Sequence, residues 1–217
     1  MRTKTFLFFI FTAICGFASA QITHTPDGGK VDQNADKILK ATAKQFSSNT
    51  VSMTVTMVNK DAHKHETGRM KADVLYKGGK YRVSFDGNVI YCDGNSTWHW
   101  NKDVGEVTVN DISGGDDDLL NPASILANYT KNYSAKFIRK EQNGDNIIDL
   151  MPKKAKSYYK VRLTINNNTP RKMEMHNYDS SCGEYLITNF KTNVKSSDSD
   201  FSFPKNQNPN VEIIDMR

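Results

Sequence analysis

The chain of 217 residues carries 29 Lys and Arg against 24 Asp and Glu, a formal net charge of +5. The basic residues are scattered between apolar positions, so the sequence lacks the clustered positive charge of a nucleic-acid-binding surface. Its length suits one domain with a sizeable core, and the sequence has no repeat, long linker or low-complexity tract that would divide it.

The N-terminus has the features of a secretory signal peptide. Arg2 and Lys4 precede an apolar run from Phe6 to Ile14, and Ala18-Ser19-Ala20 supplies small residues for cleavage. The apolar run is too short to form a permanent transmembrane helix. We therefore expect cleavage after Ala20 and export of residues 21–217 as a single domain, whose net charge falls to +3 because two basic residues are lost.

The sequence contains three cysteines. Cys15 raises the possibility of a lipoprotein signal, but Ile14 precedes it where such signals require a small residue. The exported part keeps Cys92 and Cys182, and an even number of cysteines in an exported protein permits a disulfide. Two free thiols fit the sequence equally well, so the pairing stays open at this point.

A helix is expected from Asn34 to Ser47, where apolar residues recur at helical spacing. Lys37, Lys40 and Lys44 fall on the opposite side, as in a helix with one face against the protein. The expected buried face consists of Ala35, Ile38, Leu39, Thr42 and Phe46.

After Asn49 the hydrophobic period changes from that of a helix to that of a strand. Val51, Met53 and Val55 alternate with polar residues, and similar alternation recurs along most of the chain. Asn143-Gly144 is a strong signal for a hairpin turn. The eleven expected strands are 51–57, 66–76, 81–85, 89–92, 97–101, 107–109, 135–142, 146–151, 158–166, 171–178 and 184–194.

The strand pattern stops between Ile112 and Tyr133. There Asn121-Pro122 has the composition of a helix N-cap followed by the first helical residue. Three aspartates at 116–118 precede it, which suits the helix dipole and suggests a solvated hinge. We expect a short amphipathic helix that acts either as a fixed plug or as a moving lid, with an apolar stripe formed by Leu119, Leu120, Ile125, Leu126 and Tyr129.

The number of strands and helices predicts the architecture. Eleven strands spaced by about 4.8 Å make a sheet roughly 50 Å wide, whereas a helix has a diameter of about 10–12 Å. Two short helices do not cover a flat sheet of that width, so the sheet has to curl, as its twist favours. We predict a mainly β (α+β) fold: a single curved antiparallel sheet that forms an incomplete β-barrel, closed by the N-terminal helix and the lid helix.

Such a curled sheet is expected to retain an apolar hollow. Methionines in the predicted strands suit a surface that repacks around a ligand. Composition alone favours the alternative, in which they fill an ordinary core. They include Met53, Met57, Met70, Met151, Met173 and Met175.

Few residues suggest catalysis or metal binding. His63, His65 and Glu66 are close enough in sequence for a metal site, but they lie in a polar loop with no obvious further ligand. The aspartates at 116–118 lack the spacing of a calcium loop. The sequence has no nucleophile elbow, phosphate-binding loop or dinucleotide fingerprint. We expect neither enzymatic activity nor a metal or cofactor.

The order of these elements resembles the LolA family of periplasmic lipoprotein carriers. The shared order is a signal peptide, a helix, six strands, a proline-containing lid helix and further strands. Several local motifs match in the same order. Lys77-Gly78-Gly79-Lys80-Tyr81 resembles the family's Arg-Pro-x-x-Phe turn, Asp93-Gly94 with Trp98 and Asn101 its D-G-x-x-x-W-x-x-N hairpin, Asn121-Pro122 with Ile125-Leu126 its lid, Leu150-Met151-Pro152-Lys153 its L-x-P-K, and Phe201-Ser202-Phe203-Pro204 its terminal F-x-F-x-P.

The resemblance implies a periplasmic, monomeric protein that shields lipoprotein acyl chains and delivers them from the inner to the outer membrane. The implied partners are acylated lipoproteins, an inner-membrane lipoprotein-releasing transporter and an outer-membrane acceptor. The residues expected to line the cavity and lid are Met53, Val55, Met57, Tyr81, Val83, Phe85, Trp98, Trp100, Leu119, Leu120, Ile125, Leu126 and Tyr129.

The resemblance also implies a contact that holds the lid shut. In the family an Arg of the turn matched by Lys77 hydrogen-bonds lid residues, and Lys here keeps the charge without the planar fork of donors. The residue matched by Tyr81 is expected near the cavity mouth. A carrier of another lipid or glycolipid, a ligand-sensing regulator on the same fold, and a structural adhesin with a filled interior are the alternatives.

Overall fold

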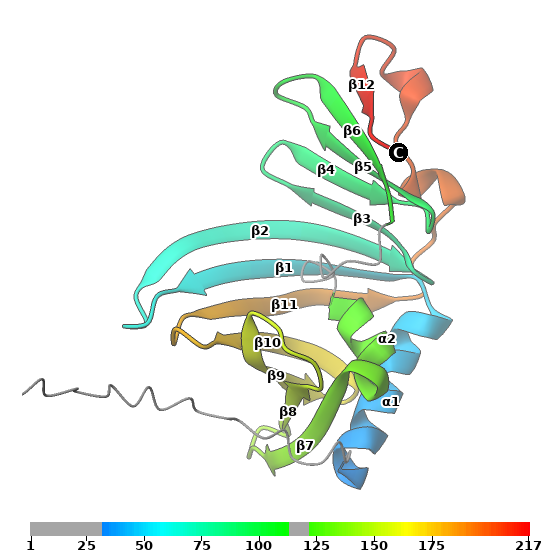
Figure 1. Ribbon diagram of the computed structural model, residues 1–217. Coiled ribbons are helices and arrows are strands. Elements are labelled where there is room, and N and C mark those ends of the chain that lie inside the picture. The colour runs from blue at the N-terminus through cyan, green and yellow to red at the C-terminus, as the bar shows by residue number, and fades with distance from the viewer. Residues whose placement is uncertain (1–31, 113–121) are drawn as a thin grey trace, which may run out of the picture.

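In the computed structural model, which describes residues 32–112 and 122–217, one strongly curved sheet forms most of the protein (Figure 1). The strand order is β12-β6-β5-β4-β3-β2-β1-β11-β10-β9-β8-β7. The elements are α1 (Gln33–Ser48), β1 (Val51–Lys60), β2 (Glu66–Lys77), β3 (Lys80–Phe85), β4 (Asn88–Cys92), β5 (Ser96–Asn101), β6 (Glu106–Asp111), α2 (Pro122–Asn132), β7 (Tyr133–Lys140), β8 (Asn146–Pro152), β9 (Tyr158–Asn166), β10 (Thr169–Asn177), β11 (Cys182–Thr192), the 3-10 helices η2 (Asp198–Phe201) and η3 (Lys205–Gln207), and β12 (Glu212–Asp215).

The sheet is open, because its two end strands, β7 and β12, lie at opposite ends of the strand order. The predicted incomplete barrel is therefore confirmed, and the eleven predicted strands all occur with ends that differ by a few residues. A twelfth strand was not predicted. β12 pairs in parallel with β6, so the sheet is mixed. All four of its residues are exposed, and a strand without a buried face lacks the alternation that identifies strands in sequence.

Helix α1 forms as the sequence predicts. Asp32 is its N-cap, and the carboxylate accepts hydrogen bonds from the backbone N–H groups of Asn34 (2.8 Å) and Ala35 (3.1 Å). The buried residues are those of the predicted face, except that Ile38 is only partly buried. They are Ala35, Leu39, Thr42 and Phe46.

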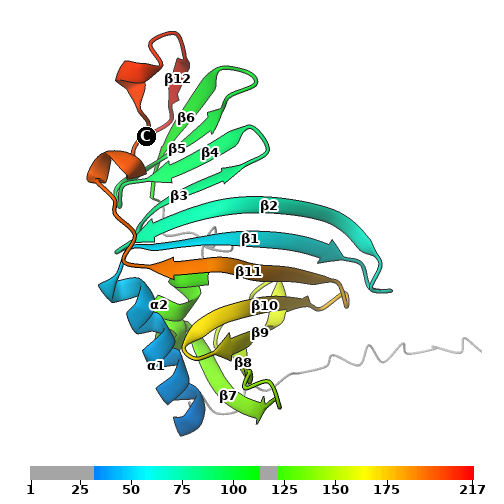
Figure 2. The same cartoon turned by 180° about the vertical axis from the view of Figure 1, so that it is seen from behind.

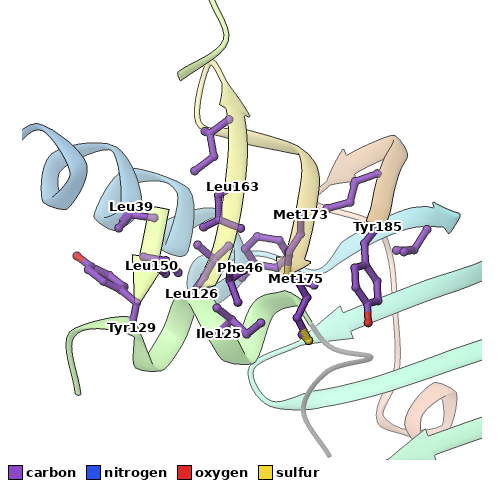
Figure 3. Packing of buried hydrophobic residues seen from close by; sticks show 14 of the residues in the cluster. Leu39, Phe46, Ile125, Leu126, Tyr129, Leu150, Leu163, Met173, Met175 and Tyr185 are labelled. Atoms are coloured by element: carbon purple, nitrogen blue, oxygen red, sulfur yellow. The ribbon is translucent and has the colours of Figure 1, made fainter. Parts of the chain in front are cut away.

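Both α-helices lie on the concave side of the sheet, against the half formed by β7 to β11 (Figures 1 and 2). We call this side the inner face and the opposite side the outer face. Residues of α1, α2 and the inner face form one continuous hydrophobic cluster. Figure 3 shows Ile125 and Leu126 of α2 gathered with Phe46 of α1 beside Met173 and Met175.

A second, smaller hydrophobic cluster lies on the outer face of β4, β5 and β6. The chain beyond β11 covers it, since Phe203 packs edge-on against Trp100, with ring centroids 5.3 Å apart, and against Tyr91 at 6.4 Å. The apolar residues of β4 to β6 therefore lie mainly on the outer face, whereas those of β7 to β11 lie on the inner face. The cluster consists of Val89, Tyr91, Val107, Val109 and Phe203, with Trp98, Trp100 and Val211 packed against it.

Cys92 and Cys182 are both buried, and no disulfide joins them. This resolves the alternative that the sequence leaves open. None of the helices in residues 32–112 and 122–217 has the length and apolar character needed to cross a membrane. The predicted signal peptide, residues 1–20, lies outside the described residues.

Candidate functional site

The inner face of the sheet presents rows of apolar side chains that run across neighbouring strands. Strand register aligns residues from β1, β11, β10, β9 and β8 opposite one another. Since side chains in register share a face, these residues form a continuous surface that crosses five strands. One such row consists of Met57, Tyr185, Met173, Leu163 and Ile148.

Helix α2 packs its apolar stripe into this inner cluster. It begins at Pro122, as predicted, because proline is favoured at the first position of a helix. Ile125, Leu126 and Tyr129 are only 5%, 2% and 4% exposed. The stripe thus occupies the place where the sequence predicts a lid. Leu119 and Leu120, which were predicted to extend it, lie outside the described residues.

A hydrogen bond joins α2 to α1. The hydroxyl of Tyr129 donates to Asp36 Oδ1 at 2.8 Å, and Lys40 Nζ lies 2.7 Å from Asp36 Oδ2. The contact with Lys40, followed by that with Tyr129, lowers the pKa of Asp36 below its ordinary value. Burial, followed by the hydrogen bond to Asp36, raises the pKa of Tyr129. The tyrosine therefore stays a neutral donor and the aspartate a charged acceptor.

The C-terminal end of α2 is held to the strands that follow it. Lys153 binds this end twice: its backbone N–H donates to the carbonyl of Asn132, and its Nζ to that of Thr130, both at 2.8 Å. Tyr133, which begins β7 directly after α2, shares a buried hydroxyl–hydroxyl contact of 2.6 Å with Tyr158. The C-terminal end of α2 is thus bound by the residue that follows β8, and β7 is joined to β9, whereas Tyr129 joins α2 to α1.

Six of the predicted cavity residues on β1 and β3 lie on the inner face. Met53, Val55 and Val83 are buried within the main cluster. Met57, Tyr81 and Phe85 are partly buried and pack against it. The structure thus brings these strand residues and the stripe of α2 into one cluster.

Trp98 and Trp100 do not belong to this surface, which corrects their placement in the predicted cavity. Cross-strand pairing puts Arg82 opposite Tyr91 and Tyr91 opposite Trp98, so Trp98 shares the outer face with Arg82. Both tryptophans pack in the second cluster under the C-terminal segment. His99, between them, points to the other face and is exposed, as predicted from the alternation of side chains.

Lys77 stays a prediction as the residue that holds the lid, because residues 113–121 of the predicted lid segment lie outside the described residues. It is exposed at the end of β2, and its charge lowers the pKa of Asp198 in η2, though less than Lys80 does. In the part of the chain that the structure describes, Lys77 makes no hydrogen bond or ion pair with α2. Among the described residues, Tyr129 and Asp36 make the side-chain hydrogen bond that joins α2 to α1. In the sequence, Asp36 and Lys40 have the spacing of an ordinary surface ion pair, so nothing there distinguishes Asp36.

A pocket of about 590 Å³ does adjoin the sheet, but on the outer face and with a largely polar lining. It lies over β1, β2, β3 and β11, beside the segment 194–200. The apolar hollow expected from the sequence is therefore not this pocket. Beneath α1 and α2 the inner face is covered by packed side chains.

The described residues contain no group of three or more His, Cys, Asp or Glu side chains placed to hold a metal ion. His63 and His65 are exposed, and their backbone N–H groups donate to Asp61 Oδ1 in a surface turn. The aspartates at 116–118 lie outside the described residues.

Comparison with known proteins identifies relatives of this fold. The family model described as outer membrane lipoprotein carrier protein LolA matches residues 52–204. No curated protein sequence matches the chain significantly.

Several solved structures are similar. An uncharacterized conserved protein from Thermus thermophilus aligns with a TM-score of 0.59 at 12% identity, over 84% of this chain and 99% of that one. A LolA superfamily protein from Nitrosomonas europaea gives 0.45 at 16% identity, over 78% and 97% of the two chains. The MucA/MucB complex of Pseudomonas aeruginosa gives 0.41 at 14% identity, over 78% of this chain and 61% of that one.

Proposed function

The chain belongs to the LolA family, the family of the outer membrane lipoprotein carrier protein. From that premise we propose that it is a periplasmic carrier, which shields the acyl chains of lipoproteins against its inner face and delivers them from the inner to the outer membrane. The observation that carries this proposal is the position of α2. Its apolar stripe covers an apolar face, and the hydrogen bond between Tyr129 and Asp36 ties its middle to α1.

The energetics of acyl transfer suit such an arrangement. Each methylene removed from water contributes about 0.8 kcal/mol, so a chain of about sixteen carbons represents roughly 13 kcal/mol. Burial of a large apolar side chain contributes about 1.5–3 kcal/mol, so the three buried residues of α2 represent about 5–9 kcal/mol. An acyl chain thus gains enough to displace the helix, and reburial of the helix offsets part of the cost of release.

The proposal includes a route and partners. The expected signal peptide, cleaved after Ala20, would export residues 21–217 to the periplasm. The carrier would receive acylated lipoproteins from an inner-membrane releasing transporter and pass them to an outer-membrane acceptor. No step of this transfer requires a cofactor or a catalytic residue.

Native mass spectrometry of the protein purified from its own cell envelope tests the proposal. A carrier is expected to retain lipoprotein, which adds the mass of a triacylated or diacylated polypeptide. Retention of phospholipid or glycolipid alone would show that the cargo is that lipid and not a lipoprotein. A protein free of lipid, or bound only to an unacylated peptide, would contradict the carrier function and favour an adhesin or a regulator.

A substitution in α2 tests whether the helix is displaced by ligand. Ile125→Asp should weaken the packing of α2 and raise the binding of an apolar fluorescent probe several-fold, because the inner face becomes accessible. Thr130→Asp is the matched control, since it adds the same charge to an exposed position of the same helix. Equal probe binding by both variants and the wild type would contradict a displaceable helix.

A further inference from the structure

The pocket on the outer face is a second candidate site, on the opposite side of the sheet from the surface that α2 covers. Its volume of about 590 Å³ lies in the range of small-molecule sites. Most such sites are predominantly apolar, but this one is lined largely by hydroxyl, amide and charged side chains. Its lining therefore suits a polar ligand and not an acyl chain.

A β-bulge shapes the wall of this pocket. The register of β1 against β11 shifts between Ser52 and Thr54, and Asn189 of β11 adopts a left-handed conformation with φ 52°. Its amide donates to Thr54 Oγ1 at 3.3 Å, and that hydroxyl donates to Asp73 Oδ1 at 2.8 Å. The bulge thus brings an asparagine amide to a buried threonine, and β-bulges often redirect side chains at functional sites.

Both carboxylates of the pocket already have donors. Asp73 accepts the hydroxyl of Thr54. Asp200 accepts the backbone N–H and the hydroxyl of Ser197, at 2.8 and 3.0 Å, and lies 3.6 Å from a guanidinium nitrogen of Arg82. The two negative charges are therefore largely satisfied within the protein.

Two of the positive charges of the pocket, by contrast, have no partner within the described residues. Lys191 and Lys195 line the pocket, and among residues 32–112 and 122–217 neither has an ion pair or a side-chain hydrogen bond. Arg82, the third cation, has a guanidinium nitrogen 3.6 Å from Asp200 Oδ1. The charge that the pocket offers to a ligand is therefore positive, beside the hydroxyls of Ser52 and Ser84.

We propose that this pocket binds a small phosphorylated polyol, whose phosphate lies between Lys191 and Lys195 and whose hydroxyls contact Ser52, Ser84 and Asn189. Lysine binds phosphate as a point charge, and hydroxyl and amide groups supply the directional bonds that distinguish a polyol from a bare anion. The same chemistry occurs in free sugar phosphates and in lipid headgroups. This site is independent of the proposed carrier function, because it lies on the other face of the sheet.

Isothermal titration calorimetry with the full exported chain tests this site. Glucose 6-phosphate should bind, and both glucose and inorganic phosphate should bind at least about tenfold more weakly, since each lacks half of the contacts. Lys191→Ala and Lys195→Ala should each weaken the binding of glucose 6-phosphate by about tenfold. Lys37→Ala, at an exposed position of α1, should leave it unchanged.

A second arm identifies the source of the ligand. Cosedimentation with phosphatidylglycerol vesicles, lost in Lys191→Ala, would assign the site to a lipid headgroup. Binding of glucose 6-phosphate alone would assign it to a soluble compound. Failure of both ligands to bind would overturn the proposal. So would inorganic phosphate binding as tightly as the sugar phosphate, or equal effects of Lys191→Ala and Lys37→Ala. Ser84→Trp, with its thermal unfolding measured, should block binding by filling the pocket.

Discussion

Strands β7 to β11 and strands β4 to β6 carry most of their apolar residues on opposite faces of the sheet. In the half formed by β7 to β11, the hydrophobic cluster lies on the inner face under α1 and α2. The outer face of this half carries ion pairs, with Arg162 bound to Asp149 through two hydrogen bonds of 2.7 and 2.9 Å. In the half formed by β4 to β6, the cluster lies on the outer face under Phe203, and the inner face carries polar residues such as Thr108 and Asn110.

The difference separates a permanent cover from a displaceable one. The C-terminal segment is built into the sheet, since it continues into β12, which pairs with β6. Helix α2 forms no strand pairing and is held by its apolar stripe and a few hydrogen bonds. On this account the β4–β6 half is structural, and the face beneath α2 is the surface that exchanges its cover for a ligand.

The largest expected effect is on the permanent cover. Phe203→Ala removes the ring that packs against Trp100 and Tyr91, and it should lower the free energy of unfolding by about 3–5 kcal/mol. Chemical denaturation followed by tryptophan fluorescence measures this loss. Tyr178→Ala, at a site 65% exposed, is the control and should have little effect. A large rise in the binding of an acyl probe to the folded Phe203→Ala protein would break the distinction between the halves.

A smaller effect is expected on the outer face of the β7–β11 half. The side chain of Asp149 is only 10% exposed, and Asp149→Ala removes the carboxylate that binds Arg162. The substitution should lower the free energy of unfolding by about 2–3 kcal/mol. The matched control is Glu66→Ala, because the pair of Glu66 with Arg69 is about half exposed and its loss should not be measurable. Equal stability of the two variants would show that the ionic outer face does not stabilise this half.

The smallest expected effect is a response of the displaceable cover to pH. Hydrogen bonds from Lys40 and Tyr129 hold the pKa of Asp36 below the ordinary value of 3.8. Because the folded pKa is lowered, the contribution of Asp36 is fully present above that value and is lost as the pH falls through the lowered pKa. Binding of an apolar probe should therefore rise modestly below pH 3.8, in protein that circular dichroism shows to be folded.

Two control variants for this pH response each replace one carboxylate by an amide. Asp36→Asn should abolish the rise, because the side chain no longer titrates. Asp179→Asn should keep it, although hydrogen bonds from Ser181 lower the pKa of Asp179 as well, since that residue lies in the β10–β11 turn. A rise that persists in Asp36→Asn would show that the contact of α2 with α1 does not depend on this charge.

The sequence predicted the elements well, because each helix and most strands bury one face and so carry a clear hydrophobic period. It did not predict which face of the sheet each strand buries. Alternation places Trp98 and Trp100 on one side of β5, but Val83 and Phe85 alternate in the same way on β3. Only the register and the covering segments decide whether two such stripes meet.

Part of that information was present in the turns. A two-residue turn at Asp86-Gly87 pairs Phe85 with Asn88, which aligns Val83 with Ile90 and Arg82 with Tyr91. The same pairing continued through the next hairpin aligns Tyr91 with Trp98. Trp98 therefore lies on the same face of the sheet as Arg82 and on the opposite face from Val83. The contact of Tyr129 with Asp36 is different, because it joins positions 93 residues apart and no local pattern signals it.

Hydrogen exchange of the two covers, with and without a bound tripalmitoylated peptide, shows whether an acyl chain displaces α2. We expect the amides of α2 (Pro122–Asn132) to exchange faster when the peptide is bound, while those of β12 (Glu212–Asp215) are unchanged. Unchanged or slower exchange of α2 in the complex would contradict the displacement of this helix by an acyl chain.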